Sequence, residues 1–240
     1  MKIFKLRDCK YIDIKKLRHY IFINPNDILG DINKNKTLDY IKNIHNKYYI
    51  NGEIVKYHSY NDIKNLLSKF DDELCKLYLQ INYNYPALLA DIGRYIILYY
   101  NGGIYHDLKC ISNKNMIEFL DTMPLNVELI GEEHPYEINR VRNTNIIVLQ
   151  KYSKFLESLL QSIKVKLSKS FYAYGPGKVF MLGSGIYIYK FKQYIKYNKH
   201  KSIKDIFKYP FFKSNQIIFD NTIYNKNIKK WQNTYQYIFR

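Results

Sequence analysis

The stretch "PALLADIGRYIILYYNGGIYHDLKC", residues 86–110, changes from helical to extended periodicity at a pair of glycines. Pro86 suits the first turn of a helix, where its missing N–H costs no hydrogen bond. Apolar residues recur at helical spacing up to Gly102 and Gly103, and glycine readily adopts the left-handed conformation that ends many helices. The stretch therefore predicts a buried helix followed at once by a strand over residues 104–111.

The charged residues of this stretch are candidates for chemistry. Asp91 and Arg94 share one face of the predicted helix and can form an ion pair. Alternation along the predicted strand puts Asp107 and Lys109 on one side and His106 on the other. We therefore expect Asp107 and Lys109 to act on one ligand and His106 to be structural. The alternatives are a surface ion pair of little consequence, a strand-end carboxylate and a solvated lysine.

The rest of the chain alternates between the two kinds of periodicity. Strands are predicted over 17–23, 53–60, 125–131 and 144–150, and helices over 37–49, 61–70, 71–81 and 153–167. This alternation indicates an α/β sheet with helices packed on it. The segment "YGPGK", residues 174–178, is predicted to be a loop that brings backbone amides close to Lys178.

Composition narrows the class of protein. The 240 residues suit one large domain with at most a small appendage. The net charge of +17 is spread along the chain and not gathered in one stripe, so it fits an anionic small substrate as well as nucleic acid. The abundance of Ile, Lys, Asn and Tyr indicates a low-GC genome, such as that of a large DNA virus or a bacterium. Three scattered cysteines, no signal-like N-terminus and no long apolar run lead us to expect a cytoplasmic protein, in the host cytoplasm if viral.

The order and spacing of Asp91, Arg94, Gly102-Gly103, Tyr105 and Asp107 resemble the core signature of DXD-type sugar transferases. This group includes family 32-like enzymes, such as yeast-type mannosyltransferases and capsular polysaccharide sugar transferases. Weaker resemblance covers residues 14–25, 145–163 and 174–177. The resemblance implies a GT-A (Rossmann-like) fold, with a mixed, mostly parallel sheet flanked by helices. It places the nucleotide-sugar-binding and catalytic domain at residues 1–190, with a C-terminal extension at 191–240 packing on the same domain.

The resemblance also implies roles for single residues. Asp91 and Arg94 would bond hydroxyls of the donor sugar, and Asp107 would contact the ribose and, directly or through water, a metal. Phe22 would stack on or flank the base, and Trp231 would close over the diphosphate. The expected donor-binding set is Phe22, Asp91, Arg94, Tyr105, Asp107, Gly175, Lys178 and Trp231, and the expected catalytic set is Asp91, Arg94, Asp107 and Lys109.

Lys109 departs from the pattern of these enzymes. Their second aspartate normally ligates Mn²⁺ or Mg²⁺, hard cations that prefer oxygen ligands. An ammonium group cannot ligate a metal, so Asp107 is the one metal ligand left in the motif and metal dependence stays open. The metal neutralises charge on the departing diphosphate, which positioned cations can share. Our hypothesis is that Lys109 partly replaces the metal, helped by Lys178 or Lys229.

The expected activity is transfer of a hexose-type sugar from a nucleotide-diphosphate sugar to a glycan or protein hydroxyl. A UDP-sugar is our first expectation for the donor and a GDP-sugar the second, and the resemblance implies a retaining reaction. One alternative is a catalytically silent relative that binds nucleotide or glycan. The other is a basic nucleic-acid-binding protein, whose binding would depend steeply on salt.

Overall fold

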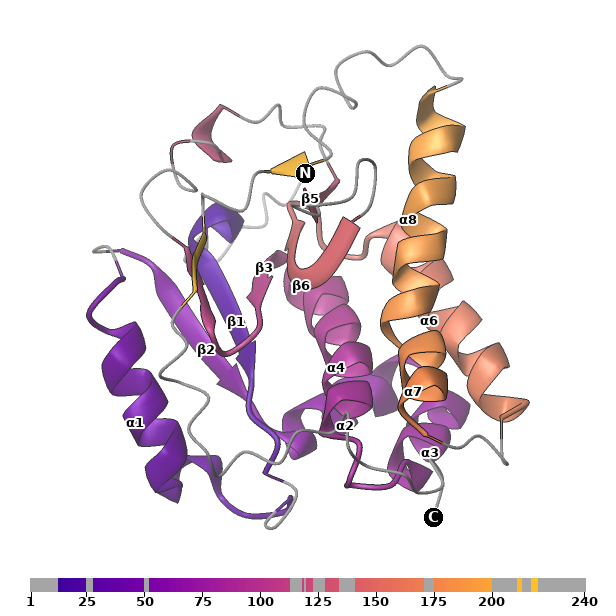
Figure 1. Cartoon of the computed structure of the whole chain (residues 1–240), viewed down its shortest axis with the longest axis horizontal. Helices are drawn as coiled ribbons and strands as arrows, with labels where there is room; N and C mark the ends of the chain where they lie inside the picture. The colour runs from indigo at the N-terminus through magenta and orange to yellow at the C-terminus, as the bar shows by residue number, and fades with distance from the viewer. Residues whose placement is uncertain are drawn as a thin grey trace, which may run out of the picture.

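The computed structural model describes residues 13–24, 28–49, 52–112, 118, 120–122, 128–133, 141–170, 175–199, 211–212 and 217–219 (Figure 1). A six-stranded sheet with strand order β2-β1-β3-β6-β5-β7 forms its centre. The strands are β1 (Leu17–Ile21), β2 (Ile54–His58), β3 (Gly103–His106), β5 (Leu129–Glu133), β6 (Val141–Val148) and β7 (Phe211–Phe212). A separate pair joins β4 (Cys110–Ser112) to β8 (Ile217–Phe219).

Pairing in the main sheet is mixed. β1 runs parallel to β2 and β3, and β5 runs parallel to β7. β6 is antiparallel to both of its neighbours, β3 and β5. Three of the five pairings are therefore parallel, and the predicted mixed, mostly parallel sheet is confirmed.

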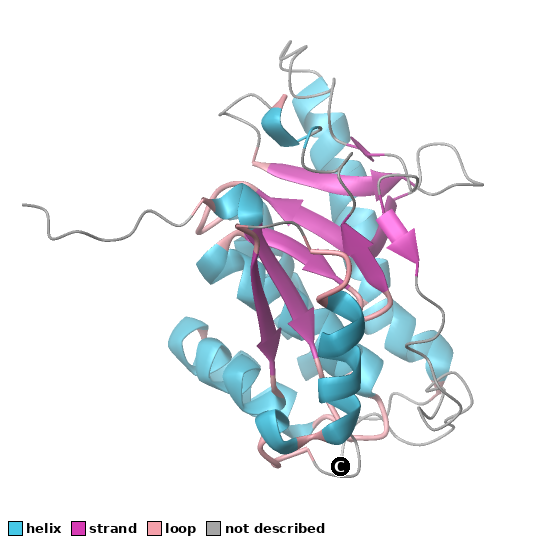
Figure 2. Cartoon of the chain, turned by 90° about the vertical axis from the view of Figure 1, so that its left-hand side faces the viewer, coloured by secondary structure: helices cyan, strands magenta, loops and turns pink. Residues whose placement is uncertain are grey.

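Helices cover both faces of this sheet (Figures 1 and 2). They are α1 (Lys36–His45), α2 (Tyr60–Phe70), α3 (Asp72–Gln80), α4 (Pro86–Asn101), α6 (Lys154–Ser168), α7 (Pro176–Leu182) and α8 (Ser184–Lys199), with 3-10 turns at Ile14–Lys16 and Ile32–Lys34. α1 packs a small cluster of Phe22, Leu38, Ile41 and Ile44 on one face. α2, α3, α4, α6, α7 and α8 all contribute to the larger core on the other.

The passage from α4 to β3 follows the sequence pattern closely. Pro86 is the first residue of α4, which ends at Asn101 before Gly102 and Gly103, with φ of 63° and 92°. A side chain at Gly103 would place its Cβ 2.8 Å from the backbone oxygen of Leu17, so glycine is required on both counts. His19 donates from Nε2 to the Gly102 carbonyl oxygen at 3.0 Å, which ties this corner to β1.

The strand predicted over 104–111 is interrupted, and this part of the prediction was wrong. β3 ends at His106, and the amide of Cys110 bonds the Asp107 carbonyl at 2.7 Å to close a turn. His45, the last residue of α1, donates from Nε2 to the Leu108 carbonyl at 2.7 Å. This bond from α1 holds the turn outside the sheet. Alternation therefore stops at His106, and it gives no reason for Asp107 and Lys109 to point the same way.

The prediction of a loop over 174–178 was also wrong in part. Gly175, with φ of 79°, precedes α7, and Pro176 is the first residue of that helix. Lys178 therefore lies on a helix. The predicted domain boundary between residues 190 and 191 falls inside α8. Within the described ranges, no helix combines the length and the apolar character needed to cross a bilayer.

Candidate functional site

Three charged side chains gather where β3 ends. α4 precedes β3 by a tight turn and runs back along it, so the first half of α4 lies beside the carboxyl end of the strand. Nη2 of Arg94 lies 2.8 Å from Oδ1 of Asp91 and 3.4 Å from Oδ1 of Asp107. Ligands of open α/β sheets commonly bind at this edge. We call Asp91, Arg94 and Asp107 the acid–arginine cluster.

Asp91 is the most enclosed carboxylate of the cluster, with a residue exposure of 5%. Its Oδ1 also accepts a hydrogen bond from Nδ2 of Asn143 at 3.0 Å. Its Oδ2 accepts from the backbone amide and the hydroxyl of Ser184, at 3.0 and 2.9 Å. α4, β6 and the start of α8 therefore meet at this one side chain.

Arg94 joins the two carboxylates to the neighbouring backbone. Its Nε donates to the carbonyl of Ala90 at 3.3 Å, and its Nη1 donates to the carbonyl of Asn143. The guanidinium carbon lies 4.5 Å from the centre of the Tyr105 ring, a cation–π arrangement. These contacts fix the guanidinium plane, so Arg94 is a rigid positive charge at the base of the site.

Asp107 is the member that opens toward solvent, with a side-chain exposure of 22%. The hydroxyl of Tyr105 donates to its Oδ1 at 2.9 Å, the oxygen that also faces Arg94. Its backbone amide bonds the carbonyl of Thr144 at 2.8 Å. A ligand arriving at the strand edge would therefore meet Asp107 before it meets Asp91 or Arg94.

Burial sets the electrostatics of this cluster. It raises the pKa of Asp91, and the Arg94 guanidinium opposes that rise. Burial alone would lower the pKa of Arg94, but Tyr105 and the two carboxylates outweigh it and raise that pKa. Burial also raises the pKa of Tyr105 well above its usual value. Arg94 is therefore charged and Tyr105 is a neutral donor at any physiological pH.

The described residues do not form a complete metal site by themselves. Among the described residues, no group of three or more His, Cys, Asp and Glu side chains could hold a metal ion. Asp107 is the single carboxylate of the motif, and its Oδ1 already faces Tyr105 and Arg94. A divalent ion here would need ligands from elsewhere, such as the phosphate oxygens of a bound nucleotide.

Of the other predicted site residues, those that the structure describes lie on different segments of the fold. Phe22 is 7% exposed and packs in the α1 cluster. Lys109 is half-buried in the turn after Asp107, and Lys178 is exposed on α7. Trp231 and Lys229 lie outside the described residues. His106 bonds Oδ1 of Asn145 at 2.6 Å in the buried interior, an environment that agrees with the structural role expected for it.

Sequence reasoning missed Asn143 and Ser184. They contact Asp91 across 52 and 93 residues of chain, in segments with no recognisable motif. The nearest signal was the "GSG" at residues 183–185, because small residues permit close approach of two elements. A side chain at Gly183 would place its Cβ 2.2 Å from Oδ2 of Asp91.

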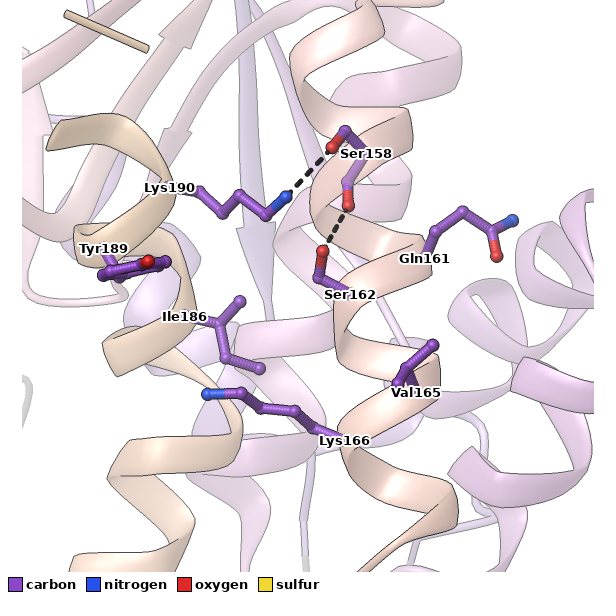
Figure 3. Close-up of a pocket in the computed structure, with 8 residues that line it drawn as sticks. All are labelled: Ser158, Gln161, Ser162, Val165, Lys166, Ile186, Tyr189 and Lys190. Carbon is purple, nitrogen blue, oxygen red and sulfur yellow. Dashed lines mark hydrogen bonds between the residues drawn. The ribbon is translucent and has the colours of Figure 1, made fainter. Parts of the chain in front are cut away.

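A cavity of about 430 Å³ lies away from the acid–arginine cluster, between α6 and α8. Figure 3 shows Lys190 reaching from α8 toward Ser158 of α6, where Nζ and Oγ are 3.2 Å apart. None of the predicted site residues lines this cavity. The candidate site is therefore defined by the charged cluster and not by the cavity.

Comparison with known proteins gives a family match. Residues 13–133, half of the chain, match the family described as "Glycosyltransferase sugar-binding region containing DXD motif". That segment includes all three members of the acid–arginine cluster. No curated protein matches the sequence.

Two solved structures are similar at low identity. One is described as "PaToxG Glycosyltransferase", with 20% identity and a TM-score of 0.49 over 78% of this chain and 72% of that chain. The other is a transferase mutant, with 16% identity and a TM-score of 0.39 over 85% of this chain and 92% of that chain. The family assignment rests on the match over residues 13–133.

Proposed function

Because the chain belongs to the family of glycosyltransferases whose sugar-binding region contains the DXD motif, we propose that it transfers a hexose-type sugar from a nucleotide-diphosphate sugar. A UDP-sugar is the first candidate for the donor and a GDP-sugar the second. The acceptor is a hydroxyl of a glycan or a protein, and the reaction retains the anomeric configuration. We place this activity in the cytoplasm.

The observation that supports this proposal best is the placement of Asp107. It directly follows β3, at the edge where α/β sheets commonly bind nucleotides, and it is the most open carboxylate of the cluster. Arg94 and Tyr105 fix its orientation through Oδ1. A carboxylate held in this way can accept hydrogen bonds from the ribose hydroxyls of a nucleotide.

Asp91 and Arg94 form the base of the proposed donor site. Their expected bonds to sugar hydroxyls stay predictions, because both side chains are almost fully enclosed. A sugar hydroxyl would have to exchange with one of the protein donors that now surround Asp91. Retaining transfer needs no dedicated carboxylate base beside the acceptor, so we assign none.

The leaving diphosphate needs positive charge nearby as the bond to the sugar breaks. A bound Mn²⁺ or Mg²⁺ would supply that charge, with Asp107 as its ligand from this motif. Lys109, two residues beyond Asp107, and Lys178 on α7 are protein cations that we propose share this role. Under this proposal turnover continues when divalent metal is removed.

The direct test is release of free sugar and nucleotide from a panel of UDP- and GDP-sugars, each assayed with Mn²⁺ and with EDTA. Many transferases slowly hydrolyse their donor without an acceptor, so an unknown acceptor does not block the assay. Turnover of one donor supports the proposal, and turnover in EDTA supports charge neutralisation by lysine. Nucleotide binding without turnover would indicate the silent relative, and salt-sensitive binding of DNA or RNA without any donor binding would indicate the nucleic-acid alternative.

A further inference from the structure

The carboxylate of Asp91 is enclosed by three hydrogen-bond donors and one cation of the protein. A carboxylate offers about four acceptor positions. Arg94 forms an ion pair with Oδ1 at 2.8 Å, Asn143 donates to Oδ1 at 3.0 Å, and two groups of Ser184 donate to Oδ2 at 3.0 and 2.9 Å. Saturation of this kind fixes both the position and the plane of a side chain.

Asn143 contacts both members of the ion pair. Its Nδ2 donates to Oδ1 of Asp91 and to the hydroxyl oxygen of Ser184, at 3.0 and 2.7 Å. Its backbone carbonyl accepts a hydrogen bond from Arg94. Because a carboxylate can only accept, the amide NH₂ of Asn143 must face Asp91, and its orientation is set by chemistry. β6 thus holds Asp91 by a side chain and Arg94 by the main chain.

Ser184 contributes from the other side, at the first residue of α8. Both its amide and its hydroxyl donate to Oδ2 of Asp91. The approach is close because the preceding residue is Gly183, where a side chain would collide with that same oxygen. Asp91 is therefore clamped between β6 and the junction of α7 with α8.

We propose that Ser184 and Asn143 are positioning residues of the donor site, which hold Asp91 and Arg94 so that Arg94 presents a fixed guanidinium to Asp107. The inference rests on the proposed function, since it concerns the site at which the donor binds. Ser184 and Asn143 fix Asp91 and Arg94, and Arg94 in turn orients Asp107, the carboxylate that we propose contacts the donor. Small displacements of positioned groups reduce rates strongly, even when they start away from the chemistry.

The test compares donor hydrolysis by the wild type, Ser184→Ala and Ser184→Thr. Ser184→Ala keeps the backbone amide but loses the hydroxyl bond to a charged group, so kcat should fall about tenfold with KM changed by less than about twofold. Ser184→Thr keeps the hydroxyl and should retain most of kcat. Ser68→Ala is the matched control, because it removes an exposed helical serine hydroxyl far along the chain, on α2.

The pH dependence of kcat/KM separates a positioning role of Ser184 from a general loss of stability. The site needs Asp91 ionised, and burial raises its pKa while the Ser184 hydroxyl opposes that rise. Without the hydroxyl that pKa rises further, so the acid limb of kcat/KM should move to higher pH in Ser184→Ala only. The other charged and titratable groups facing Asp91 are Arg94 and Tyr95 of α4, Tyr105 of β3 and Asp107 beyond β3, and all of them are unchanged in the variant.

The outcomes are distinct. A fall in kcat with a shifted acid limb, restored by threonine, supports the inference. Wild-type kinetics in Ser184→Ala overturn it while the proposed function stands. A lower KM in Ser184→Ala also overturns it, since the hydroxyl would then occupy a position that a donor hydroxyl takes. A wild-type protein that hydrolyses no donor overturns the proposed function and this inference with it.

Discussion

Arg18 and Arg94 both form buried ion pairs with a carboxylate, but their surroundings differ. Arg18 of β1 lies 2.6 Å from Glu53, and the two side chains are 0% and 3% exposed. Arg94 lies 2.8 Å from Asp91, and those side chains are 6% and 7% exposed. Arg94 also faces Asp107, whose side chain is 22% exposed. The first pair lies wholly inside the molecule, whereas the second continues to the surface.

The two arginines also differ in electrostatics. Burial lowers the pKa of Arg18 in spite of Glu53. The pKa of Arg94 is raised, because Tyr105 and two carboxylates outweigh its burial. A buried ion pair is therefore no sign of a functional site by itself. A pair becomes a candidate where it supports a partly exposed carboxylate at the end of a strand.

Removal of Arg94 should have the largest effect on both stability and donor hydrolysis. Arg94→Met leaves Asp91 and Asp107 without the charge between them, so the free energy of unfolding should fall by about 3–5 kcal/mol. Donor hydrolysis by the folded protein should fall about a thousandfold or more. Urea unfolding and initial rates of sugar release measure the two effects.

Arg94→Lys is the control for charge. Lysine keeps the positive charge but cannot reach both carboxylates and the Asn143 carbonyl in one plane. We expect partial recovery of stability and little recovery of hydrolysis. Full recovery of both would show that only the charge of Arg94 matters.

Removal of Arg18 should affect stability alone. Arg18→Met leaves Glu53 buried without its cation and should lower the free energy of unfolding by about 3 kcal/mol. The double variant Arg18→Met/Glu53→Leu should recover much of this loss, because apolar replacements of buried ion pairs are often neutral. A fall in kcat for the folded Arg18→Met protein would contradict the distinction between the two pairs.

Acid should destabilise the fold through histidines near β1. Burial lowers the pKa of His58 to about 4 and that of His106 to about 3, and it lowers the pKa of His19. These rings are neutral in the folded protein and become protonated on unfolding below pH 6.5, so stability is full above that pH and is lost as pH falls. Between pH 6.5 and pH 5, His58 alone should cost on the order of 2 kcal/mol.

Urea unfolding at several pH values measures this loss, and His58→Gln provides the comparison. The variant lacks the titrating ring, so its stability should fall less steeply with acid. Equal slopes in the two proteins would show that His58 does not carry the effect.

Lys109 should have the smallest effect of the series. Lys109→Ala removes one cation two residues from Asp107 in the chain, and donor hydrolysis should fall about tenfold in EDTA, with a smaller fall when Mn²⁺ supplies charge. Lys109→Arg keeps the charge and should retain most of the rate. Equal losses in both variants would count against a simple charge role.

Local sequence patterns predicted most of the helices and strands and the short signature of the site. The helix expected from Pro86 to the glycine pair is α4. Alternation along the strand led us to expect a structural His106, and its buried bond to Asn145 agrees, because His106 still lies within β3. The signature around Asp91, Arg94 and Asp107 was readable because its spacing is short. These features depend on residues that lie close together in the sequence.

Long-range contacts could not be predicted in the same way. The end of β3 at His106 depends on the turn that Cys110 closes onto Asp107 and on the bond of His45 to the Leu108 carbonyl, 63 residues along the chain. The bonds of Asn143 and Ser184 to Asp91 join segments whose sequences show neither motif nor periodicity that points to α4. Such contacts follow from the packing of the whole fold.

The most direct test of the central claim compares donor hydrolysis by the wild type and Asp107→Asn. Asparagine has the same shape and can still accept from Tyr105, but it removes the charge at the open end of the cluster. The account predicts a fall of about a hundredfold or more in kcat/KM, with the free energy of unfolding changed by less than about 1 kcal/mol. A wild-type rate in Asp107→Asn would contradict the assignment of this cluster as the donor site.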